Sequence, residues 1–199
     1  VYFVRHDLDG HHFSYLRSGS AASHIQPEDL APDIINHAKY LHVSGISQAI
    51  SANASQTVSA AITLARAAGA RVSYDPNLRF ALWSLEDARA VISATITMTD
   101  EFLPGMDELA KVSGLNTPEE LVAWAHAQGA KVVVLKMGSK GVLASDGGQI
   151  QRIPAFVVKA LDATGAGDCF NGAYLSRRSR GEDVFTSARW AVASAALST

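Results

Sequence analysis

The feature that most constrains the fold is a regular alternation of strand-like and helix-like segments from residue 40 onward. The strand-like segments lie at 40–44, 71–75, 101–103 and 131–136. The helix-like segments lie at about 54–68, 84–94, 106–113 and 117–129. Short loops join these segments, and this order requires parallel strands connected by right-handed crossovers. The sequence therefore predicts an α/β fold in which a parallel sheet carries helices on both faces.

The segments outside this alternation complete the predicted architecture. Residues 1–5 and 11–17 are β-prone runs around a turn sequence, typical of a hairpin, and a helix is expected to start at Pro27 and run to Ala38. A β-prone stretch with a turn at 146–148 precedes two helices that start near 166 and 182. We expect a small β-hairpin unit at residues 1–20 and an α/β core at residues 21–199. Both ends resemble cuts through structure, so the chain is expected to be a fragment.

Composition narrows the class of protein. The 199 residues are 48% hydrophobic and 18% charged, with a net charge of −2, which is typical of a globular domain. No basic cluster indicates a nucleic-acid partner, and no apolar run approaches the roughly 20 residues that span a bilayer. The single cysteine, Cys169, excludes an internal disulfide and fits a cytoplasmic location.

One glycine-rich string carries the chemistry. Asp162-Ala-Thr-Gly-Ala-Gly-Asp168 leads directly into a helix-like segment. A loop of small residues at a helix N-terminus presents unbonded N–H groups and the positive end of the helix dipole, which together bind phosphate. A carboxylate inside an anion site needs a reason to be there, and accepting the proton of a substrate hydroxyl supplies one. The alternative is a glycine-rich turn closed by an acid.

This string resembles the signature of the PfkB (ribokinase-like) family of carbohydrate kinases. The resemblance implies that Asp168 is the catalytic base and that Gly165, Ala166 and Gly167 form the anion hole. It also implies ATP and Mg²⁺ as cofactors, with a monovalent cation as a further candidate. Lys136-Met-Gly-Ser-Lys-Gly141 is similar to the family loop that lies against the nucleotide. The ATP-binding residues implied in this way are Asn77, Lys136, Gly138, Gly141, Gly165 and Gly167.

The metal position is less complete than the anion hole. Pro104-Gly105-Met106-Asp107-Glu108 resembles the family's Asn-x-x-Glu region, which organises Mg²⁺ through water. Glu108 stands at the glutamate position, but Gly105 replaces the usual asparagine. Glu108 is therefore either a water-mediated metal residue or a simple acid in the first turn of a helix.

Two strings bear on the substrate. Tyr15-Leu-Arg17-Ser-Gly and Asp75-Pro-Asn-Leu-Arg79-Phe most resemble the 2-keto-3-deoxygluconate kinases within the family. That resemblance implies a sugar-acid substrate, whose carboxylate Arg79 binds while Tyr2, Tyr15 and Arg17 supply further contacts. Two arginines suit a carboxylate because guanidinium binds it through two parallel hydrogen bonds. The alternatives are a solvated arginine and a tyrosine that only packs.

Two other functions stay open at this point. The Asp-Pro-Asn-Leu-Arg string also resembles fructokinases, whose substrate is a neutral ketose. A non-catalytic sugar-binding module on the same fold is the second alternative, since fold does not fix function. The resemblance also implies that residues 1–20 form the β lid of the family, that the protein is a homo-oligomer, and that family chains are about half as long again as this one. The charge and composition indicate no nucleic-acid or membrane partner.

Overall fold

The computed structural model describes the backbone of residues 2–7 and 10–15 and the whole of residues 19–199. Its main sheet has six strands, which lie side by side in the order of the sequence. They are β3 (Tyr40–Ser44), β4 (Arg71–Asp75), β5 (Glu101–Phe102), β6 (Val132–Lys136), β7 (Val142–Ser145) and β8 (Ile150–Ile153). Strands β3 to β6 are parallel, which confirms the predicted parallel sheet. β7 and β8 are antiparallel additions at one edge, because short turns cannot provide a crossover.

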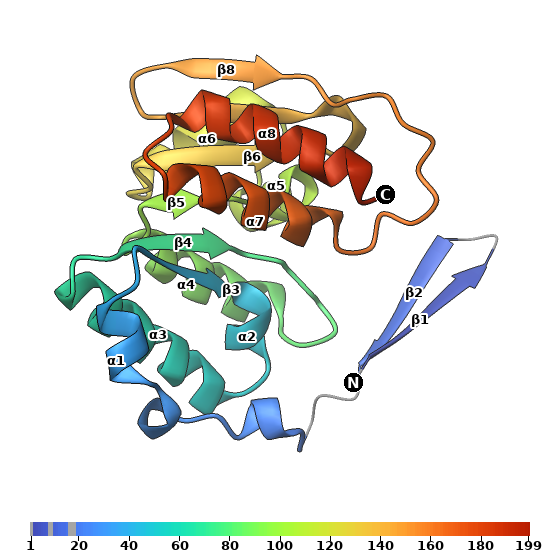
Figure 1. Ribbon diagram of the computed structural model, residues 1–199. Helices are drawn as coiled ribbons and strands as arrows, with labels where there is room; N and C mark the ends of the chain where they lie inside the picture. The colour runs from blue at the N-terminus through green and yellow to red at the C-terminus, as the bar shows by residue number, and fades with distance from the viewer. Residues whose placement is uncertain (1, 8–9, 16–18) are drawn as a thin grey trace.

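Helices cover both faces of the sheet, as predicted. They are α1 (Pro32–Asn36), α2 (Gly45–Ala49), α3 (Ala52–Ala67), α4 (Leu85–Ile96), α5 (Met106–Ser113), α6 (Pro118–Ala127), α7 (Ala166–Arg178) and α8 (Val184–Leu197). Figure 1 shows α7 and α8 together across one face of the sheet. Val134 of β6 packs with these two helices, whereas Val133 and Leu135 pack with α3 to α6 in a second apolar cluster. The consecutive apolar residues of β6 therefore serve two cores, one on each face.

The prediction of one continuous helix at 27–38 is wrong, because the structure has two short helices there. Pro27–Asp29 forms a short 3₁₀ helix, η2, and α1 does not begin until Pro32. Between them Ala31 is extended, with φ −101° and ψ 90°. The cause is Pro32, whose ring disfavours helical backbone in the residue before it. Two further 3₁₀ turns are η1 (Ala21–Ser23) and η3 (Gly138–Lys140).

The N-terminal segment forms a two-stranded sheet of its own. Strands β1 (Tyr2–Asp7) and β2 (Gly10–Tyr15) pair antiparallel, with Tyr2 opposite Tyr15. This pairing confirms the predicted hairpin. Within the described part of the chain, no helix is long and apolar enough to cross a membrane.

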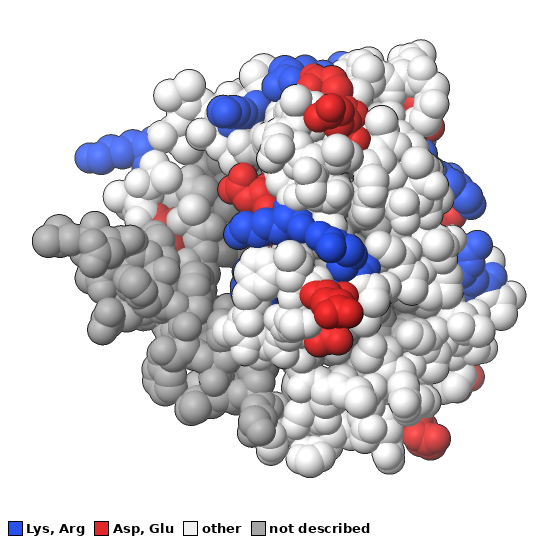
Figure 2. Space-filling model, turned by 180° about the vertical axis from the view of Figure 1, so that it is seen from behind, with Lys and Arg blue, Asp and Glu red and all other residues white. Residues whose placement is uncertain are grey.

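Charged side chains of both signs are spread over the surface. Figure 2 shows acidic and basic residues interspersed on one face of the molecule. Arg152 and Glu119 form an exposed ion pair of 2.8 Å, with about half of each side chain accessible to solvent (50% and 60%). Lys131 forms a 2.6 Å pair with Asp100, whose side chain is mostly buried. Exposed pairs of the first kind add little stability, because water screens them.

Candidate functional site

Three motifs meet at the carboxyl edge of the parallel strands. β4 ends at Asp75, β6 ends at Lys136, and α7 crosses the sheet beside both. The Lys136 ammonium lies 2.6 Å from Asp75 Oδ2 and 3.3 Å from Asn171 Oδ1, and Asn171 Nδ2 donates to the same Asp75 oxygen at 2.6 Å. Ligands in α/β sheets bind at this edge. The three motifs therefore converge at one edge of the sheet.

The start of α7 has the geometry of an anion site. Gly165 precedes the helix with φ 82°, in the left-handed region that favours glycine, and no described side chain caps the helix. The N–H of Ala166 bonds to the Ala163 carbonyl at 3.1 Å, but those of Gly167 and Asp168 have no acceptor among the described residues. Asp168 is the third helical residue and is exposed to solvent. Two unbonded N–H groups and a carboxylate therefore share one helix turn at the positive end of the dipole.

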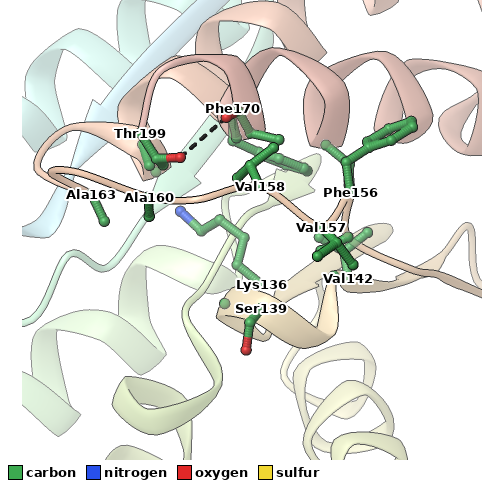
Figure 3. Close-up of a pocket in the computed structure, with 18 residues that line it drawn as sticks. Lys136, Ser139, Val142, Phe156, Val157, Val158, Ala160, Ala163, Phe170 and Thr199 are labelled. Carbon is green, nitrogen blue, oxygen red and sulfur yellow. Dashed lines mark hydrogen bonds between the residues drawn. The ribbon is translucent and has the colours of Figure 1, made fainter.

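A cavity of about 470 Å³ opens beside this turn. That volume is in the range of small-molecule sites. Figure 3 shows Lys136 directed into it, between the η3 loop and the segment that carries Ala160 and Ala163. Its lining includes four of the six predicted ATP-binding residues: Lys136, Gly138, Gly141 and Gly167. The apolar remainder was not predicted and comes mainly from Val142, residues 155–158, Phe170 and the end of α8. Apolar walls with a few polar groups at one end suit a heterocyclic base linked to an anion.

Gly141 is required where the cavity wall folds back on itself. A Cβ at this position would lie 2.0 Å from the Ile153 carbonyl oxygen, and its φ is +83°. Only glycine allows both the close approach and the left-handed backbone. The glycine predicted to face the nucleotide therefore also closes the loop between β6 and β7.

Asn77, the remaining candidate for ATP outside the helix turn, lies on the other side of Asp75. Its N–H donates to Asp75 Oδ1 at 3.1 Å, and its φ of 40° is left-handed. Asparagine tolerates this region better than most residues, so the turn is compatible with the sequence. Neither Asn77 nor Gly165 lines the cavity beside α7.

Arg79 and Glu108 contact each other, although Arg79 was predicted to bind the substrate and Glu108 to bind a metal through water. Arg79 Nη1 lies 3.4 Å from Glu108 Oε1 and donates to the Leu78 carbonyl at 2.9 Å. Burial and the nearby Asp75 carboxylate raise the pKa of Glu108, and two neighbouring cations and the Gly105 N–H partly offset this. A Cβ on Gly105 would lie 3.2 Å from the Glu108 carboxylate, so glycine leaves room for that side chain beside the helix start. Glu108 is thus both a first-turn helix acid and part of the charge cluster at the sheet edge.

The other predicted substrate residues cannot be placed at the site. The side chains of Tyr2 and Tyr15, and all of Arg17, lie outside the described residues.

Sequence reasoning missed two groups of polar contacts. Asp75 and Asn171 received no role, although both are buried and hold Lys136. Glu101, in the middle of the sheet, is buried as well, and accepts hydrogen bonds from Tyr174 and Arg178 of α7. The signal available in the sequence was a charged residue at or within a strand that has covered faces. These contacts hold α7 at its middle, through Asn171, and towards its C-terminal end, through Tyr174 and Arg178.

Residues 2–199 match the family described as pfkB family carbohydrate kinase. The chain belongs to this family. A PfkB protein from Polaromonas sp. JS666 has a similar crystal structure, with a TM-score of 0.89 and 34% identity, covering 99% of this chain and 65% of that one. An E. coli protein solved in complex with ATP and Mg²⁺ gives a TM-score of 0.88 at 26% identity, covering 98% of this chain and 63% of that one. The ribokinase-like fold predicted from the sequence is confirmed.

The curated relatives of this chain are named for different substrates. A 2-dehydro-3-deoxygalactonokinase of Haloferax volcanii is 33% identical over 185 residues, which cover 92% of this chain and 58% of the relative. A fructokinase of Klebsiella pneumoniae is 36% identical over 176 residues, covering 85% of this chain and 56% of the relative. The chain thus spans somewhat more than half of the length of these two relatives. One acts on a sugar acid by its name, and the other on a neutral ketose.

Proposed function

We propose that this protein phosphorylates a hydroxyl group of a sugar acid with ATP, converting 2-keto-3-deoxygluconate to its 6-phosphate. The observation that carries the proposal is the first turn of α7. There the exposed Asp168 directly follows Gly167, which lines the cavity together with Lys136, and the N–H groups of Gly167 and Asp168 have no acceptor within the described residues. A binding module needs an anion site but no carboxylate within it, so the arrangement favours catalysis over binding alone.

The proposed reaction is an in-line phosphoryl transfer. The substrate hydroxyl oxygen forms a bond to the γ-phosphorus of ATP, the bond from that phosphorus to the bridging oxygen of ADP breaks, and Asp168 takes the hydroxyl proton. The N–H groups of Gly167 and Asp168 stabilise charge on the transferred group, with Ala166 and Gly165 shaping the turn. The apolar end of the cavity holds the adenine and excludes water from it.

Mg²⁺ would be held mainly by the phosphates in this proposal. Within the described residues, no group of three or more His, Cys, Asp or Glu side chains is placed to hold a metal. Mg²⁺ does not need such a group, because it keeps several waters and is bound by one or two carboxylates together with substrate phosphates. Glu108, partly buried near Asp75, is the carboxylate available for a water-mediated contact, and the ion would neutralise phosphate charge.

The sugar-acid assignment rests on Arg79 and on the relatives of that class. The Arg79 side chain is about one-third exposed and follows the Asn77 turn at the same sheet edge as Lys136. Its pair with Glu108 is 3.4 Å long, which is longer than a strong charge-assisted hydrogen bond, so a substrate carboxylate bound at two points can compete with Glu108. The same pair favours a second candidate, a fructokinase-like kinase, because Glu108 already supplies Arg79 with a negative partner.

A phosphorylation screen separates the two candidates. The purified protein is incubated with ATP, Mg²⁺ and either 2-keto-3-deoxygluconate, 2-keto-3-deoxygalactonate or fructose, and ADP release is followed. A kcat/KM for the acids well above that for fructose supports the proposal. Preference for fructose would replace it with the second candidate, and no phosphorylated product with any sugar would refute both.

The proposal also includes several features that were predicted from the sequence. They are a β-lid segment at residues 1–20, an α/β core at 21–199, a homo-oligomer, a cytoplasmic location and a monovalent cation.

A further inference from the structure

One buried carboxylate, that of Asp75, contacts three residues around the site. Asp75 has 6% of its side chain exposed, yet it accepts three hydrogen bonds from three separate segments. Oδ1 accepts from the Asn77 N–H, while Oδ2 accepts from Lys136 at 2.6 Å and from Asn171 at 2.6 Å. A buried charge with all its partners in place is held strongly, because few waters compete for it.

The Asp75 contacts leave the Lys136 ammonium with one direction open. An ammonium group has three N–H donors. Asp75 and Asn171 accept two of them, and no other described residue accepts from Lys136. The amino group lines the cavity, and a Cβ built on Gly167 would lie only 3.8 Å from it. The third donor is therefore available to an anion bound at the start of α7.

The same contacts fix the rotation of α7. Asn171 lies three residues after Asp168, on the same side of the helix, and is 2% exposed. Its bonds to Asp75 and Lys136 therefore set the direction in which the turn containing Asp168 faces. On the other side, Asp75 holds the left-handed Asn77, two residues before Arg79.

We propose that Asp75 is the positioning residue of this site, which aligns Lys136 and the first turn of α7 with the phosphoryl group being transferred. This inference rests on the proposed kinase function. In it Lys136 is the group that touches the phosphate, and Asp75 and Asn171 act through Lys136. The charge of Asp75 balances Lys136 before ATP binds, and its position keeps one ammonium donor directed at the anion site.

The test is a double-mutant cycle with Asp75→Asn and Lys136→Met, read as kcat and as the Kd of a non-hydrolysable ATP analogue. Asp75→Asn should lower kcat by about 10- to 100-fold, the range expected when a catalytic group is misplaced by about an ångström. The Kd of the analogue should not weaken by more than about threefold, because loss of a carboxylate leaves the site more positive. In the Lys136→Met background, Asp75→Asn should change kcat by less than about twofold, since the group it positions is gone.

Asp100→Asn is the matched control. Asp100 also forms a 2.6 Å pair with a lysine, Lys131, and accepts a backbone N–H from Val72, but at the opposite end of the strands. It should lower the melting temperature and leave kcat unchanged. Asn171→Ala serves as a second variant if Asp75→Asn does not fold. It should lower kcat too, and should likewise have almost no effect once Lys136 is methionine.

Two results would overturn the inference. One is a kcat for Asp75→Asn close to wild type, and the other is an equal loss of kcat in both backgrounds, the pattern of a merely structural residue. A wild-type protein that phosphorylates no sugar would instead refute the proposed function, and this inference with it. Turnover by the wild type together with additive variants refutes the positioning role alone.

Discussion

Arg178→Met tests whether a buried ion pair anchors the C-terminal end of α7. Two guanidinium nitrogens of Arg178 lie 2.9 Å from Glu101 Oε1, and the side chains are 11% and 1% exposed. Glu101 keeps the hydroxyls of Tyr40 at 3.0 Å and Tyr174 at 2.5 Å, and a more distant Arg71 at 3.4 Å. Removing one partner of a buried pair costs about 3–5 kcal/mol, because the other charge stays buried. The remaining donors place the expected loss at the low end, about 3 kcal/mol.

The assay is urea unfolding followed by circular dichroism, with thermal unfolding as a second measurement. For a chain of this size, a loss of about 3 kcal/mol corresponds to a fall in melting temperature of roughly 6–12 °C. Arg152→Met provides the control, since its 2.8 Å pair with Glu119 is exposed and should contribute less than about 1 kcal/mol. The double variant Glu101→Leu with Arg178→Met should regain part of the loss, because no charge is then left buried. A loss for Arg178→Met no larger than for Arg152→Met would refute the reasoning.

Two further predictions concern the substrate and the pH dependence of stability. Arg79→Ala should lower kcat/KM for a sugar acid by about 2–5 kcal/mol, the usual cost of unpairing a charge, and hardly change that for fructose; equal losses in parallel steady-state assays would remove the sugar-acid assignment. For Asp100, burial acts to raise the pKa, but Lys131 and the Val72 N–H outweigh it, so the folded-state pKa is lowered. Its stabilisation is therefore present above the unfolded value of about 3.9 and is lost as pH falls through the folded pKa. The difference in melting temperature between wild type and Asp100→Asn should shrink in that acid range, and a difference that grows there would contradict the sign.

The sheet was predictable because its signals are local. Apolar runs such as Val132–Leu135 and helix starts such as Ser84 and Thr117 are readable in a few residues, and both caps are present in the structure. The helix at 27–38 failed for an equally local reason, since Pro32 interrupts it and the apolar spacing alone hid this.

The partners of charged side chains were not predictable in the same way. Asp75 and Lys136 are 61 residues apart, and Asp75 and Asn171 are 96 apart, so no local pattern pairs them. A glutamate such as Glu101 is expected at the solvent-exposed surface, yet it is buried and accepts hydrogen bonds from Tyr40 of β3 and Tyr174 of α7. Arg79 was assigned to a substrate from a motif, and its contact with Glu108 appears only when the loops fold together.

The cavity shows the same division. The family resemblance pointed to its glycines, Gly138, Gly141 and Gly167, and at Gly141 the left-handed, closely approached backbone is the physical reason that the motif has glycine. Its apolar walls come from segments such as residues 155–158 and the end of α8. Alanine and valine are common in any protein core, so these residues did not indicate a cavity wall.

The most direct test of the account is the turnover of Asp168→Asn in single-turnover phosphoryl transfer with ATP, Mg²⁺ and 2-keto-3-deoxygluconate. Asparagine keeps the size of the side chain but takes no proton, so the chemical step should slow by about 10²–10⁴-fold. The affinities for sugar and nucleotide should stay within a few-fold of wild type. A variant that transfers the phosphoryl group at close to the wild-type rate would show that Asp168 is not the base.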